Sequence, residues 1–116
     1  MRPSVPMRGE IWRADLEPVR GHEQGRVRPV LIISNNILNH GPSDLLTIVP
    51  LTTKARPLRA FLRIDPPEGG LSQTSYIICD QVRTITKERI GRRSGSISPR
   101  NLSEVERRLK FLLDLS

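Results

Sequence analysis

Three segments of the sequence place polar side chains at the edges of apolar runs, where such groups can bind a ligand through charge and hydrogen bonds. The three segments are residues 21–29 (GHEQGRVRP), 51–54 (LTTK) and 80–84 (DQVRT). They contribute carboxylate, guanidinium, ammonium and hydroxyl groups, and the first also holds two glycines. These groups could form a polar site if the fold brings the segments together.

Each segment also has an ordinary structural explanation. Glu23 and Arg28 could form a surface ion pair that contributes little to stability. The two threonines of the second segment could simply close a strand, because threonine favours β structure. Asp80 and Arg83 could be a cross-strand pair. No single segment therefore identifies a site by itself.

The other titratable residues do not form the pattern of a metal site. His22 and His40 both fall in expected loops. Cys79 is the single cysteine, which excludes an internal disulfide and a multi-cysteine zinc site. The following aspartates are dispersed without metal-binding spacing: Asp15, Asp44, Asp65 and Asp80. We therefore expect no metal, no cofactor and a cytoplasmic location.

The net charge of +7 on 116 residues favours a polyanionic partner, and nucleic acid is the first candidate. Only four residues are aromatic, so base stacking has few platforms and any grip on RNA should rest on charge and hydrogen bonds. No apolar run approaches the roughly 18 residues of a membrane span. The N-terminus also lacks the apolar stretch of a secretory signal.

Short β-branched and apolar runs alternate with turn residues along most of the chain. They predict strands at residues 10–15, 28–34, 45–51, 60–65, 75–80 and 82–86, the last two with an interruption near Gln81. Residues 16–27 and 35–44 hold glycine, proline and asparagine and predict loops. Residues 87–98 predict a short strand pair or an irregular segment.

One helix is expected, at the C-terminal end. Ser98 is a good N-cap, and Pro99 suits the first helical position. Apolar residues then recur at helical spacing, at Leu102, Val105, Leu109, Leu112 and Leu113. Short strands without alternating helices predict a mainly β fold, a small and partly open barrel closed by one C-terminal helix. We expect a loose leader at 1–7 and a single domain at 8–116.

Taken together, the motifs resemble those of a known family. Its signature is matched by MRGEIWRADLEPVRGHEQGRVRPVLIISNN at 7–36, VPLTTK at 49–54 and GLSQTSYIICDQVRTITKERIG at 70–91. These segments, in this order, closely resemble the MazF/PemK (Kid-type) toxins of type II toxin-antitoxin systems. The match covers nearly the whole chain, and the joint pattern is far more specific than any one piece.

The resemblance implies an SH3-like barrel of the CcdB/Kid type, a homodimer, and metal-independent cleavage of single-stranded RNA. In such enzymes the 2′-OH of the substrate attacks, leaving a 2′,3′-cyclic phosphate and a 5′-OH end. The essential arginine and threonine of the family fall on Arg28 and Thr52. The glutamate that supports the arginine falls on Glu23. A cognate antitoxin with an acidic segment is implied as the inhibitor.

The RNA groove of the family falls on Asp80, Gln81 and Arg83, and Lys54, Arg56 and Lys87 are further candidate phosphate contacts. A solvated basic surface explains the lysines and arginines equally well. Some relatives carry a catalytic arginine two residues before the aspartate, where this chain has Ile78. That version of the mechanism cannot apply here.

Two other functions fit the same composition. One is a gyrase-poisoning toxin of the CcdB kind, which shares the barrel but would not need Arg28 and Thr52 as catalysts. The other is a basic barrel that binds RNA without cutting it.

Overall fold

The computed structural model describes residues 5–16 and 27–116 and confirms a mainly β fold with a C-terminal helix. The strands are β1 Glu10–Asp15, β2 Val27–Ile32, β3 Leu45–Thr52, β4 Phe61–Ile64, β5 Ser75–Ile78, β6 Arg83–Thr86 and β7 Ile90–Ser96. The helices are α1 Asn36–His40 and α2 Pro99–Leu112, and single 3-10 turns lie at Glu68–Gly70 and Lys87–Arg89. No helix in the described ranges is long and apolar enough to cross a membrane.

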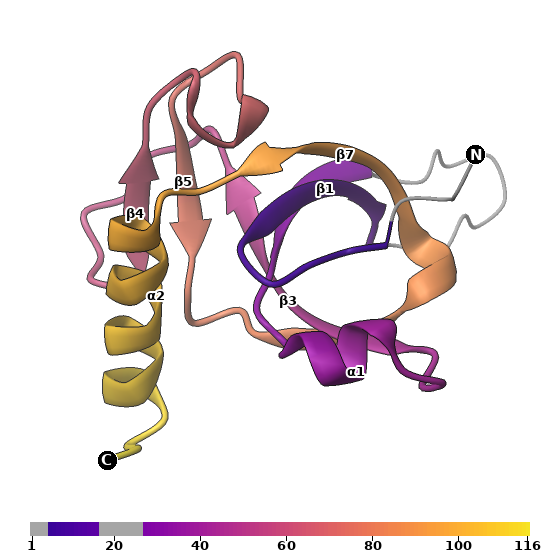
Figure 1. Ribbon diagram of the computed structural model, residues 1–116. Helices are drawn as coiled ribbons and strands as arrows, with labels where there is room; N and C mark the ends of the chain where they lie inside the picture. The colour runs from indigo at the N-terminus through magenta and orange to yellow at the C-terminus, as the bar shows by residue number, and fades with distance from the viewer. Residues whose placement is uncertain (1–4, 17–26) are drawn as a thin grey trace, which may run out of the picture.

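The strands form one antiparallel sheet with the order β4-β5-β3-β2-β1-β7. The remaining strand, β6, pairs with residues 45–48 of β3, whereas β5 pairs with residues 51–52. The sheet curls into a partly open barrel, with α1 near one end and α2 beside β4 and β5 (Figure 1). The division into a leader at 1–7 and one domain at 8–116 stays a prediction, and residues 1–4 lie outside the described part of the chain.

Both faces of the central strands are buried, so the fold has two hydrophobic clusters. One contains Ile11, Leu31, Val49, Leu51, Ile64, Leu71, Ile77, Cys79, Ile97 and Val105. The other contains Trp12, Ala14, Leu16, Val30, Ile32, Leu46, Ile48 and Ile85. Since successive side chains of a strand point to opposite faces, a shift of register by one residue would exchange the two sets.

The expected start of α2 is confirmed. The Ser98 hydroxyl accepts a hydrogen bond from Asn101 N at 3.1 Å, and Pro99 opens the helix. Val105 is fully buried, with Leu102 and Leu109 packed against the same cluster. Leu112 and Leu113 are exposed instead, so the inward apolar face is shorter than the sequence spacing suggested.

Residues 35–44, expected as a loop, contain the five-residue helix α1. Asn35 caps it by accepting from Leu38 N at 2.9 Å. Asn39 anchors it, since its buried amide donates to Ser34 O at 2.8 Å. This helix depends on side-chain hydrogen bonds, so it has no apolar periodicity that a sequence pattern could reveal. Residues 87–98 form a 3-10 turn followed by the single strand β7.

The turn at Glu68–Gly70 packs tightly against β7. Gly70 has φ +69°, and a Cβ on it would lie 1.9 Å from Ser94 O. Gly95 of β7 faces the same turn, and a Cβ added to it would lie only 2.5 Å from Gly69 C. The glycines at 69, 70 and 95 therefore allow the close approach of two backbones.

Substituting Gly70 tests this packing. Gly70→Ala combines a left-handed backbone with a steric clash, so we expect it to lower the free energy of unfolding by about 2–4 kcal/mol. Gly91→Ala is the matched control in the same strand as Gly95, because its Cβ would meet only Arg13 O at 3.5 Å. Urea denaturation measures both changes, and equal stability of the two variants would contradict the packing argument.

Candidate functional site

Arg28 and Thr52 lie near the ends of two neighbouring strands, β2 and β3. The register of β2 and β3 pairs Val30 with Pro50 and Leu31 with Val49. If this register continued two residues beyond the last pair, Arg28 would face Thr52. Directly opposite side chains of an antiparallel pair have Cβ atoms about 5 Å apart. The two ends of the strands therefore bring a guanidinium and a hydroxyl to one place.

Arg28 and Thr52 together line two adjoining clefts. The first, of about 320 Å³, is lined by Arg28, Thr52, Lys54, Arg56, Leu58, Phe61, Ile78, Asp80 and Gln81. The second, of about 390 Å³, is lined by Arg28, Pro29, Leu51, Thr52, Thr53, Lys54 and Ser75. The residues common to both are Arg28, Thr52 and Lys54. Two positive charges and a hydroxyl therefore lie where the clefts meet.

A bulge brings Asp80 and Gln81 to the first cleft. Along β3, Leu51 pairs with Ile77 of β5, but Ile48 pairs with Arg83 of β6. Residues 49–50 of β3 thus face residues 78–82, and the longer side folds into a turn closed by Gln81 N donating to Ile78 O at 3.1 Å. Pro50 lies in this interval and has no N–H to donate to a ladder, which favours a break in pairing here. The expected interruption near Gln81 is confirmed.

The first cleft is predominantly cationic. Arg28, Lys54 and Arg56 face a single carboxylate, that of Asp80. The Thr52 hydroxyl oxygen accepts a hydrogen bond from Lys54 N at 3.2 Å, so its hydrogen is available to a ligand. This group of side chains is suited to an anion that needs both charge and a neutral hydrogen-bond donor.

Cys79, next to Asp80, does not supply a nucleophile to the cleft. Its side chain is fully buried, and burial raises the pKa of the thiol to about 11. The thiol is therefore protonated near neutral pH, and the thiolate is the reactive form. Across residues 5–16 and 27–116, no group of three or more His, Cys, Asp or Glu side chains could hold a metal ion.

Two of the expected site residues lie away from both clefts. Arg83 donates from Nη2 to Leu16 O at 3.3 Å, at the end of β1, and so is not placed as a partner of Asp80. Lys87 donates from Nζ to Gly41 O at 3.1 Å, just after α1. Glu23 and His22 lie outside the described residues.

The sequence pattern did not identify the apolar lining of the first cleft. Leu58, Phe61 and Ile78 contribute it, and Phe61 pairs with Ile78 across β4 and β5. Phe61 is only partly buried, although it belongs to a strand. Its position in a strand concealed this role, because an aromatic residue there is expected to fill the core. An apolar surface beside three cations can hold a flat aromatic ligand group next to an anionic one.

Comparisons with known proteins point to one family. A family model described as PemK-like, MazF-like toxin of type II toxin-antitoxin system matches residues 7–113. Endoribonuclease EndoA of Bacillus subtilis is 34% identical over 112 residues, covering 96% of this chain and 97% of the relative. Endoribonuclease MazF9 of Mycobacterium tuberculosis is 34% identical over 113 residues, covering 93% and 96%.

Solved structures agree with the sequence relatives. A mycobacterial endoribonuclease in complex with its cognate antitoxin superposes with a TM-score of 0.79 at 28% identity, covering 97% of this chain and 98% of that one. A MazE-MazF structure from Deinococcus radiodurans gives a TM-score of 0.85 at 26% identity, covering 98% and 100%. Both matches extend over essentially the whole fold.

Proposed function

The chain belongs to the PemK-like, MazF-like toxins of type II toxin-antitoxin systems, and we propose that it is a metal-independent endoribonuclease that cuts single-stranded RNA at a short sequence motif. The main support is that Arg28 and Thr52, from different strands, line the same two clefts. A strand of RNA could pass from one cleft to the other with its scissile phosphate beside this pair.

In the proposed reaction, the 2′-OH of one nucleotide attacks its own 3′ phosphate. The new O2′–P bond forms as the P–O5′ bond breaks, leaving a 2′,3′-cyclic phosphate and a 5′-OH end. The nucleophile is already part of the substrate, so the protein contributes mainly positioning and charge. Arg28 holds two non-bridging oxygens of the dianionic phosphorane, and Thr52 donates its hydroxyl hydrogen to the same centre.

The reaction also needs a base that takes the 2′ proton and an acid that gives a proton to the leaving O5′, and solvent water can supply the second proton. A free guanidinium has a pKa above about 12 and is a poor base at neutral pH. We assign this role to Glu23, a carboxylate in the segment that precedes β2. If Glu23→Gln protein cleaved RNA at the wild-type rate, the assignment of Glu23 as the base would be wrong. The proposed roles of Arg28 and Thr52 would not be affected.

The remaining cleft residues would bind the flanking RNA. Lys54 and Arg56 contact phosphates, while Asp80 and Gln81 reach the bases or riboses from the bulge. Arg83 and Lys87 donate to backbone carbonyls away from the clefts, so we do not propose them as contacts of the RNA that binds there. The choice of cut motif would depend on residues 15–27 and 53–60, which adjoin Arg28 and Thr52 in the sequence.

The partners proposed for this chain follow from its relatives. The mycobacterial structure is an endoribonuclease in complex with its cognate antitoxin, and the Deinococcus one is a MazE-MazF structure. We therefore propose a cognate antitoxin whose acidic segment covers the cationic cleft. A homodimer and a cytoplasmic location, where mRNA is accessible, complete the proposal. The gyrase-poisoning alternative is disfavoured because the two relatives that match 96% and 93% of this chain are both named endoribonucleases.

The direct test is to incubate purified protein with a long single-stranded RNA in EDTA. We expect discrete fragments with 5′-OH ends. Removing a donor that stabilises a transition state typically costs a factor on the order of 10²–10³ in rate. Arg28→Ala should therefore lose detectable cleavage, and Thr52→Ala should be severely slowed.

Arg92→Ala is the control for the loss of one positive charge, because Arg92 is exposed on β7 and lines neither cleft. It should cut at the wild-type rate. An RNA that is shifted on a gel but left intact by the wild-type protein would favour the non-catalytic RNA-binding barrel. Near-normal cleavage by Arg28→Ala would refute the assignment of the arginine.

The salt dependence of RNA binding tests which of Lys54 and Lys87 contacts a phosphate. On single strands, the slope of log K against log salt changes by about 0.7 for each phosphate neutralised. Lys54→Ala should reduce the slope by this amount, measured with an RNA made uncleavable by a 2′-deoxy nucleotide at the mapped cut site. Lys87→Ala should leave the slope unchanged, since its ammonium group is bonded near α1. The opposite ranking would move the RNA path away from the described clefts.

A further inference from the structure

The segment between β3 and β4 has two sides. Arg56, Leu58 and Phe61 line the first cleft. Arg59, between them in sequence, instead lines a separate groove of about 410 Å³ on α2, with Glu104, Arg107, Arg108, Phe111 and Leu112. The wall of the cleft and the wall of the α2 groove are therefore opposite sides of the same short piece of backbone.

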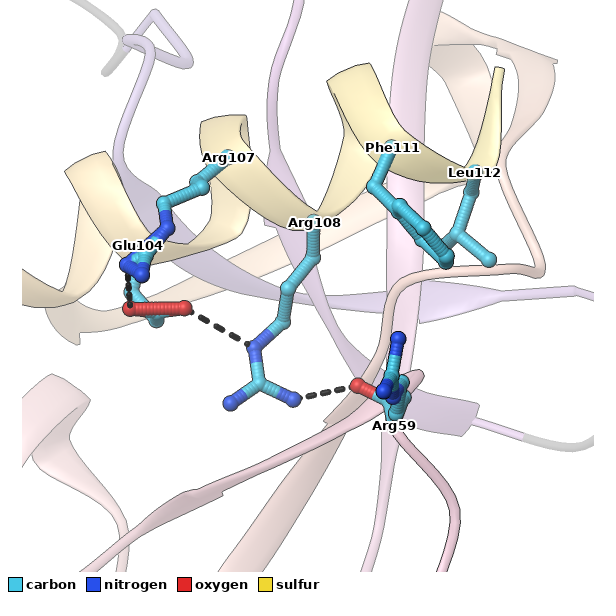
Figure 2. Close-up of a pocket in the computed structure, with 6 residues that line it drawn as sticks. All are labelled: Arg59, Glu104, Arg107, Arg108, Phe111 and Leu112. Carbon is cyan, nitrogen blue, oxygen red and sulfur yellow. Dashed lines mark hydrogen bonds and ion pairs between the residues drawn. The ribbon is translucent and has the colours of Figure 1, made fainter. Parts of the chain in front are cut away.

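Arg108 of α2 connects the helix to this backbone. Its Nη1 donates to the carbonyl oxygen of Arg59 and, at 3.4 Å, to that of Phe61. Glu104, one helical turn earlier, accepts from Arg108 Nε at 3.2 Å and so orients the guanidinium (Figure 2). The Arg108 side chain is only 29% exposed, so it has less solvent to compete for these bonds than a surface arginine.

The same backbone is also joined to the bulge. Ala60, between the two carbonyls that Arg108 binds, accepts a hydrogen bond from Cys79 N at 2.8 Å. Cys79 immediately precedes Asp80 and Gln81. Hydrogen bonds thus connect Arg108 of α2 to residues 59–61, and these residues to the bulge. The first part carries the apolar lining of the first cleft, and the bulge carries its polar lining.

We propose that Arg108 is a positioning residue for RNA binding: it fixes the wall formed by Leu58 and Phe61 by holding the backbone behind it. This inference rests on the proposed nuclease function and adds a residue that does not touch the RNA. The planar fork is essential, because a guanidinium can bind Glu104 through Nε and two carbonyls through Nη1, whereas one ammonium group cannot reproduce that geometry. Arg28 and Thr52 lie on other strands, so the chemical step should be unaffected.

The test compares the steady-state cleavage of a short RNA by wild-type, Arg108→Gln and Arg108→Lys proteins. A hydrogen bond from a charged donor changes an equilibrium by a factor of about ten or more, and RNA binding must supply this factor when Arg108 no longer holds the wall in place. We expect KM to rise about tenfold in both variants, with kcat within about twofold of the wild type. The affinity for the 2′-deoxy-blocked RNA should fall in parallel with the rise in KM.

Arg107→Gln is the matched control. Arg107 lines the same groove and carries the same charge, but its side chain is 75% exposed and approaches Glu104 only at 3.7 Å. Its KM should equal that of the wild type. An unchanged KM in Arg108→Gln, or an equal rise in Arg107→Gln, would overturn the proposal. A wild-type KM in Arg108→Lys would contradict the need for a planar guanidinium, because a positive charge alone would then be enough.

A rise in KM must come from weaker RNA binding and not from partial unfolding of the variant. Thermal unfolding of each variant sets an assay temperature at which all are folded. Should Arg108→Gln fail to fold, Glu104→Gln tests the same support, because it releases the guanidinium without removing it; an unchanged KM there would also contradict the proposal. A wild-type protein that does not cut RNA refutes the proposed function, whereas a cutting wild type with an unaffected Arg108→Gln refutes only this inference.

Discussion

The register between β2 and β3 is held from both faces of the sheet. Val30 and Ile32 of β2 belong to one buried cluster together with Ile48 of β3, while Leu31 and Val49 belong to the other. A slip by one residue would place each set of side chains in the wrong cluster, so packing on both sides opposes it. The closeness of Arg28 and Thr52 is a consequence of this packing, since both residues follow within two positions of the last pair of the same ladder and line the same clefts.

The rest of the site is arranged around that strand pair. The break in pairing opposite Pro50 directs Asp80 and Gln81 to the cleft, and residues 56–61 supply the opposite wall. The α2 helix does not enter the cleft, but Arg108 binds the carbonyls behind this wall. The proposed catalytic pair thus lies at the ends of strands, while the surfaces proposed to bind the flanking RNA come from connecting segments, whose conformation depends on hydrogen bonds to their neighbours.

The sequence predicted β1 to β6, the start of α2 and the family, because each depends on local pattern or on a long joint match, but it did not predict β7 as a single strand. It did not predict which residues face each other. The pairing of Phe61 with Ile78, and so the apolar lining of the cleft, depends on a register between distant segments. Helix α1 and the bonds of Arg108 were also missed, since both rest on polar contacts without periodicity. Lys87 was grouped with the site by charge alone, and the fold separates it from the cleft.

The central claim is that Arg28 and Thr52 act together on one phosphate. A double-mutant cycle of Arg28→Lys and Thr52→Val, measured by single-turnover cleavage of RNA, tests it most directly. If both groups hold the same transition state, the loss of rate in the double variant will be much smaller than the product of the two single losses. Losses that multiply independently would contradict a shared site.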